Sequence, residues 1–205
     1  MRYAHTKKGQ VMRLRIAQEA ARLIDEHALR DYQHAKRKAA EHLGAPETRH
    51  LPNNEEIEAA LDERHRLFMA DRHGEALEGK RRAALKAMEL LGAFQPRLVG
   101  PVLSGTAGEH TPVTLHVFTD TPEELAFLFF DRRLPFDEGE TLVRLSQHPV
   151  QERNLPLFRF LDDDGDVEVV VFPVKGLRQA PVSPVDGRPM ERATPDAVAG
   201  LLAPA

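Results

Sequence analysis

The sequence has no cysteine among its 205 residues, and this absence removes several kinds of chemistry. Disulfides, thiolate catalysis and cysteine-ligated zinc are excluded. The patterns G-x4-G-K-[ST], G-x-S-x-G and H-E-x-x-H do not occur either, so three common catalytic motifs are missing. No stretch approaches the roughly 18–20 apolar residues of a membrane span, and the basic N-terminal segment lacks the apolar core of a secretory signal. We therefore expect no membrane association and a cytoplasmic location.

A large excess of one sign of charge is also lacking. The 28 basic and 32 acidic residues leave a net charge of −4, which gives no general electrostatic attraction for nucleic acid. Local basic groups do occur in the first two expected helices, and they allow a helix-turn-helix-like interpretation of residues 12–70. Acidic residues lie among these bases, and the third expected helix is too acidic to enter a groove, so the sequence disfavours nucleic acid as a partner. The basic residues are Arg13, Arg15, Lys36, Arg37 and Lys38.

Helical signals fill the first half of the chain. Apolar and alanine residues recur at spacings of three and four, Asp31 can cap a helix, and Asn53 begins another with acids in its first turn. Gly44 and Gly74 are expected to end the helices that precede them. Because alanine dominates the apolar stripes, we expect thin cores, which favour a homodimer. The expected helices cover residues 12–29, 31–43, 53–74 and 77–93.

The second half changes in character after residue 94, where β-branched residues and prolines become frequent. We expect strands over residues 97–103, 113–118, 142–146, 157–161 and 167–172, with a helix beginning at 119–124. Residues 131–140 are expected to form a loop. The segment 180–190 is too rich in proline and glycine for regular structure, and a last short helix is expected over 195–202.

The order of these elements predicts an α+β fold in which an N-terminal helical bundle precedes a small mixed sheet with flanking helices. The expected domains are a helical domain over residues 1–74 and an α+β domain over residues 75–175. Residues 176–205 are expected to form an extended tail along the surface with a short helix.

Residues 100–117, GPVLSGTAGEHTPVTLHV, join the first two expected strands. They resemble the signature of the DNA polymerase beta-type nucleotidyltransferase superfamily, which has a hydrophobic residue, Gly-Ser, three or four residues, Gly-Thr, a polar turn and Asp-x-Asp. Gly100 and Gly105-Thr106 match the family's glycines at the family's spacing. The family's serine is replaced by Pro101, and its two metal-binding aspartates are replaced by Pro112 and Thr114.

This resemblance implies a nucleotidyltransferase-like sheet domain, and for active relatives it implies magnesium and a nucleoside triphosphate. Glu168 lies where the family's third carboxylate falls. A lone carboxylate is a poor magnesium site, so we expect no cofactor and a catalytically degenerate protein that binds a nucleotide or a protein partner. The residues expected at the nucleotide are Gly100, Ser104, Gly105, Thr106, Thr114 and Glu168.

Two alternatives to this hypothesis stay open. One is an active nucleotidyltransferase that uses magnesium at the relocated ligands Asp120, Asp166 and Glu168. The other is a regulatory interaction module, antitoxin-like or associated with nucleic acid through the helical half.

Two further constellations are weaker. His110 precedes the expected strand 113–118 and His116 lies near its end, but their spacing is not that of a recognised metal site, even with Asp120 and Glu168 added. A triad of Ser104, His110 and Asp120 rests on common residue types alone.

Overall fold

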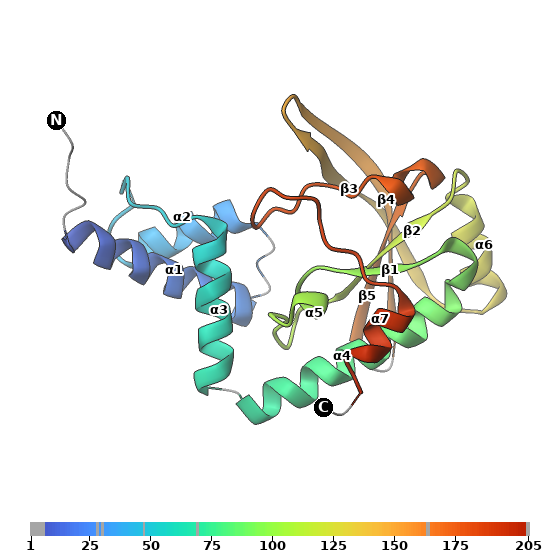
Figure 1. The fold of residues 1–205 in the computed structure, drawn as a ribbon, viewed down its shortest axis with the longest axis horizontal. Helices are drawn as coiled ribbons and strands as arrows, with labels where there is room; N and C mark the ends of the chain where they lie inside the picture. Colours follow the sequence, from blue (N-terminus) through green and yellow to red (C-terminus); the bar gives the residue numbers. More distant parts are fainter. Residues whose placement is uncertain are drawn as a thin grey trace. The chain divides into compact units, whose positions relative to one another are not determined.

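The structure is a computed structural model that describes residues 7–203 except 28, 30, 47, 69, 163 and 164; for residues 7, 8, 68 and 70–73 it describes the backbone (Figure 1). The chain divides into two compact units. The first is Met1–Gly74 with Thr106–His110, and the second is Glu75–Gly105 with Thr111–Ala205. The α+β class expected from the sequence is confirmed.

The first unit is built from α1 (Lys7–His27), α2 (Tyr32–His42) and α3 (Asn54–Phe68). Small side chains dominate its core, as the alanine stripes predicted, and a few larger apolar residues fill the remaining space. Alanine lets the helices approach closely at little entropic cost, but each alanine buries little area. The core includes Ile16, Leu23, Ala20, Ala35, Ala39 and Ile57.

Helix starts in this unit follow the expected capping chemistry. The Asp31 carboxylate accepts a hydrogen bond from the Gln33 backbone N–H at 2.8 Å. At the start of α3, Asn53 Oδ1 accepts from the Glu56 N–H at 2.8 Å, and Glu56 Oε2 accepts from the Asn53 N–H at 2.6 Å. This reciprocal pair is a capping box, which satisfies two otherwise unpaired donors.

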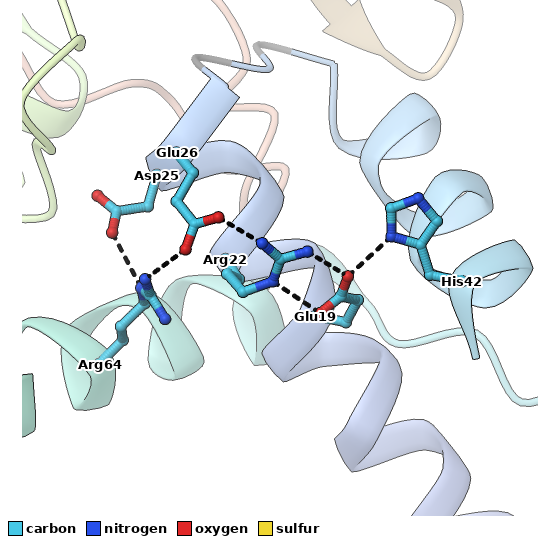
Figure 2. Close-up of polar contacts among 6 residues, drawn as sticks. All are labelled: Glu19, Arg22, Asp25, Glu26, His42 and Arg64. Atoms are coloured by element: carbon cyan, nitrogen blue, oxygen red, sulfur yellow. Dashed lines mark hydrogen bonds and ion pairs between the residues drawn. The ribbon is translucent and has the colours of Figure 1, made fainter.

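Charged side chains join the helices of the first unit to one another (Figure 2). Arg64 of α3 donates to Asp25 of α1 at 2.9 Å and to Glu26 at 2.9 Å. His42 at the end of α2 contacts Glu19 of α1 through Nδ1 at 2.9 Å. These contacts surround a thin core, so they fix the pairing of the helices more than they stabilise it.

The boundary between the third and fourth helices differs from the prediction. The structure ends α3 at Phe68 instead of near Gly74, and α4 covers Ala70–Leu90 instead of beginning near Leu77. Gly74 therefore lies inside a helix. A single interior glycine costs about 1 kcal/mol relative to alanine, which the surrounding helix-forming residues can offset. No helix in the described part of the chain is long and apolar enough to cross a membrane.

The second unit contains a mixed sheet whose five strands, within the described residues, have the order β1-β2-β5-β4-β3. β2 and β5 are parallel, and the other neighbouring strands are antiparallel. The strands are β1 (Arg97–Val99), β2 (Val113–Phe118), β3 (Phe136–Gln147), β4 (Val150–Asp162) and β5 (Gly165–Phe172). The other elements are α5 (Pro101–Ser104), α6 (Glu123–Asp131), α7 (Pro195–Gly200), η1 (Gly92–Phe94) and η2 (Val174–Arg178).

The two faces of the sheet carry different clusters. Phe129 of α6 packs on one face against Phe158 and Phe160, with ring centroids 5.9 and 5.3 Å apart. On the other face, Leu157 and Val170 are cross-strand partners in a smaller cluster that a residue of η2 joins. A helix therefore covers one face of the sheet, whereas irregular segments after β5 cover part of the other.

Two expectations for the sheet are wrong. The first strand was predicted to reach residue 103, but β1 ends at Val99 and Pro101 begins the short helix α5. Proline at the first helical position and a left-handed glycine after the last one both favour this helical turn. Residues 131–140 were predicted to form a loop, but β3 begins at Phe136, which pairs with Phe160. The predicted strand 142–146 lies within β3, but the first part of β3 was missed because it lies at the sheet edge, where charged residues break the apolar alternation.

The segment after residue 175 has little regular structure, as expected, and the predicted short helix is present as α7. Part of this segment nevertheless belongs to the sheet domain. Leu98 and Ala193 exchange backbone hydrogen bonds of 3.0 and 2.9 Å, so β1 has a neighbour on its outer side. Val198 of α7 is fully buried. The segment therefore completes the sheet at this edge.

We predict that Phe129→Ala destabilises the second unit by about 3–5 kcal/mol, because Phe129 is fully buried among three aromatic rings. Phe127→Ala on the same helix is the matched control. Phe127 is 69% exposed, so its removal should change stability by less than about 0.5 kcal/mol. Urea unfolding of the two variants measures the difference, and equal losses would contradict this description of the core.

Candidate functional site

The turn that follows β1 has a backbone that favours glycine at both ends. Gly100 has φ +71° and Gly105 has φ +99°, both in the region that side chains with a Cβ rarely adopt. Between these glycines, Pro101–Ser104 forms α5. The local sequence thus explains the local structure, since each glycine is placed where the chain must reverse around a single helical turn.

Two cations of α4 contact the segment between β1 and β2. Arg81 donates to the carbonyls of Val102 and Leu103 at 3.3 and 3.4 Å, and Lys80 donates to the carbonyl of Thr111 at 2.8 Å. Burial lowers the pKa of Arg81, whose hydrogen-bond partners in the turn are neutral carbonyls. Sequence reasoning missed both residues. The only signal was the run of three basic residues, Lys80-Arg81-Arg82, on the expected fourth helix.

Thr114 and Glu168 lie beside each other at the same end of the sheet. They are register partners on the parallel strands β2 and β5, so their side chains share a face, and Val99 pairs with Thr114 from the other side. Gly100 follows Val99 directly. The structure therefore brings together three of the residues that the sequence predicted: Gly100, Thr114 and Glu168.

Glu168 is nearly buried, with 9% of its side chain exposed, and it is paired. Arg159 on the neighbouring strand β4 donates from Nε to Glu168 Oε1 at 2.8 Å. A buried carboxylate persists as a charge only with such a partner. Because the Arg159 guanidinium neutralises this carboxylate, Glu168 alone cannot supply the negative charge that a bound metal cation needs.

Ser104 and Gly105 belong to the turn that begins at Gly100, whose carbonyl accepts a hydrogen bond from the Ser104 N–H at 3.0 Å. Ser104 is exposed, and its hydroxyl contacts the Pro101 carbonyl at 3.4 Å. Thr106 is buried and belongs to the first unit, whereas Gly105 belongs to the second. Thr106 directly follows the glycine turn, Gly100–Gly105, so its place in a phosphate cradle stays a prediction.

The relocated metal ligands do not converge. Asp120 follows the carboxyl end of β2, six residues beyond Thr114, which is roughly 20 Å along an extended strand. Its Oδ1 accepts a hydrogen bond from the Val174 N–H at 3.2 Å. Asp166 lies two residues before Glu168 on β5, at the opposite end of the sheet from Asp120. Among residues 7–203, apart from the gaps given above, no three histidine or acidic side chains form a metal-binding group. The donors at Thr114 and Glu168 do not fit Mg²⁺, which is bound through one or two carboxylates, because Thr114 is neutral and Glu168 is ion-paired with Arg159.

His116 has a structural role instead of a ligand role. Arg192 donates from Nε to His116 Nδ1 at 3.1 Å, and its guanidinium lies 5.0 and 4.8 Å from the ring centroids of Phe118 and Phe172. Burial, and then the charge of Arg192, lower the pKa of His116 from 6.5 to about 3. The imidazole is therefore neutral at ordinary pH, and it anchors the segment that contains Arg192 to the sheet.

The basic residues of the first unit are partly engaged. Arg13 donates from Nε to Glu56 at 2.7 Å, and Lys36 is 5% exposed, with a pKa lowered by burial. Of the five basic residues that suggested a nucleic-acid surface, Arg13 is thus ion-paired at a partly exposed position and Lys36 is buried. This arrangement weakens the helix-turn-helix-like interpretation.

We predict that the free energy of unfolding falls as pH decreases from about 6.5, because unfolded His116 takes up a proton that folded His116 excludes until about pH 3. The contribution is complete above the unfolded pKa and is lost at up to about 1.4 kcal/mol per pH unit below it. His116→Gln should flatten the slope that urea unfolding gives between about pH 5 and 7. His110→Gln, at an exposed position, is the control; equal slopes in both variants would refute the burial argument.

Comparisons with protein-family models, with curated proteins and with solved structures found no match to this chain.

Proposed function

We propose that this protein is a catalytically silent, nucleotidyltransferase-like protein that binds a nucleotide through its glycine turn, Gly100–Gly105. One observation supports this proposal above the others. Thr114 and Glu168 lie in register beside the strand that leads into the turn. Glu168 is the only carboxylate in this pair, and it forms an ion pair with Arg159. A cytoplasmic location, where nucleotides are abundant, belongs to the same proposal.

The turn can approach a phosphate because it has no acidic residue and two glycines. Glycine lets backbone N–H groups come close to an anion, and Arg81 lies against Gly105 from α4, about 4.0 Å from the position of an added Cβ. Pro101 contributes no N–H, so fewer backbone donors are available than the resemblance alone would imply. We therefore expect measurable but modest affinity for a triphosphate.

Nucleotidyl transfer needs divalent ions held by several carboxylates, which activate the attacking hydroxyl and stabilise the leaving phosphate. Pro112 and Thr114 provide no carboxylate, and the charge of Glu168 is balanced by Arg159. The residues at this end of the sheet consequently support binding without transfer.

Calorimetric titration with ATP, with and without magnesium, tests the proposal. We expect binding that does not require the metal. Binding that depends on magnesium, or turnover of the nucleotide, would favour an active enzyme. No binding in either condition would favour the interaction module, for which the exposed Phe127 and Phe130 of α6 offer apolar surface.

Gly105→Asn probes the turn itself. Asparagine tolerates positive φ better than other side chains, so the fold should survive while the new side chain obstructs the turn. We predict at least a ten-fold loss of ATP affinity. Gly44→Asn is the matched control, because Gly44 has φ +68° and lies in the other unit. Unchanged affinity in a folded Gly105→Asn protein would show that the turn is not the site.

A further inference from the structure

A second site lies at the opposite end of the sheet from the glycine turn. The parallel strands β2 and β5 end at Phe118 and Phe172, and the chain then diverges toward α6 on one side and η2 on the other. Around this divergence is a cavity of about 420 Å³, which falls in the range of small-molecule sites. Ligands of open α/β sheets bind outside the carboxyl ends of their strands, where such divergence opens a crevice.

The cavity is lined by two cations that have no ion-pair partner among the residues the structure describes. Arg153 comes from the part of β4 that extends past β5, and Lys175 comes from η2. Figure 1 shows that the β3–β4 hairpin projects beyond the rest of the sheet. Arg153 lies in this projecting part of β4, because the pairing of β4 with β5 begins at Leu157. Two unpaired cations at one concavity create a local positive potential in a chain of net charge −4.

The cavity also has one acidic group and apolar walls. Asp120 uses Oδ1 to accept the Val174 N–H, and Oδ2 has no partner in the described part of the chain. The Thr119 hydroxyl is already engaged with the Thr121 N–H and with Glu124. Apolar lining comes from residues such as Leu155 and Val171. The cavity therefore presents two positive positions, one negative position and an apolar surface.

From this arrangement we infer that the cavity binds a small organic anion, with an oxyanion at Arg153 and Lys175 and a hydroxyl or amino group at Asp120. A phosphate ester and a carboxylate share the required oxyanion chemistry. The site is distinct from the glycine turn, because the length of β2 separates the two ends. It therefore goes beyond the proposed nucleotide binding and does not depend on it.

Three probes separate the sources of the anion: glucose 6-phosphate, glutamate and inorganic phosphate. Backbone amide NMR signals of Asp120 and Val174 are followed during titration of the full chain. We expect saturable shifts with glucose 6-phosphate or glutamate, with half-saturation below about 10 mM, and weaker binding of inorganic phosphate. Saturable binding of glucose 6-phosphate identifies a phosphate ester as the ligand, and saturable binding of glutamate identifies a carboxylate.

The variant Arg153→Ala/Lys175→Ala should weaken this binding about ten-fold or more, because each charge-assisted hydrogen bond contributes substantially. Arg178→Ala, an exposed cation of the same η2 segment that does not line the cavity, is the matched control and should leave affinity unchanged. Gly105→Asn should also leave it unchanged, which distinguishes this site from the nucleotide site.

Three results would overturn the inference. The first is the absence of shifts with all three probes. The second is binding that the double variant leaves unaltered, which would place the anion elsewhere. The third is equal affinity for inorganic phosphate and both organic probes, which would remove the role of Asp120 and the apolar walls.

Discussion

The parallel pairing of β2 with β5 is the constraint on which the second unit depends. Its register sets Thr114 beside Glu168 at one end and brings Phe118 beside Phe172 at the other. Because parallel strands point the same way, their amino ends meet the turn after β1, whereas their carboxyl ends release two segments that diverge. The same register fixes which residues face α6 and which face the segment after β5. A slip of one residue would exchange the two faces and remove both sites.

Pairing also determines the chemistry at the amino end of the sheet. Glu168 is a buried acid on a central strand, and Arg159 on the adjacent strand balances its charge. Removing one partner of such a pair leaves a charge with little solvent, which is strongly unfavourable, so the two residues act as a unit. The arginine side chain is 45% exposed, and solvent therefore screens part of the attraction. The pair explains how a carboxylate can persist at this position without a metal ion.

The sequence predicted local features better than long-range ones. Strand β2 and the helix starts at Asp31 and Asn53 follow from β-propensity and capping chemistry, which act over a few residues. The end of β1 was missed because the backbone angle of Gly100 is not visible in a strand-like run of apolar residues. The partnership of Arg159 with Glu168 could have been inferred from their nearly symmetric places around the acidic turn. The contact of Arg192 with His116 could not, because 76 residues separate them and no periodicity relates them.

The bridge between Leu98 and Ala193 has a consequence for synthesis on the ribosome. The first unit's three helices can pack while translation continues, since their contacts are close in sequence. β1 is made early in the second unit, but its outer neighbour and the guanidinium that covers His116 emerge almost last. The edge of the sheet at β1 therefore stays uncovered while the intervening chain is synthesised. Incomplete sheets with exposed edges are prone to aggregation. Cells that make this protein would gain from chaperones that shield the edge strand during that interval.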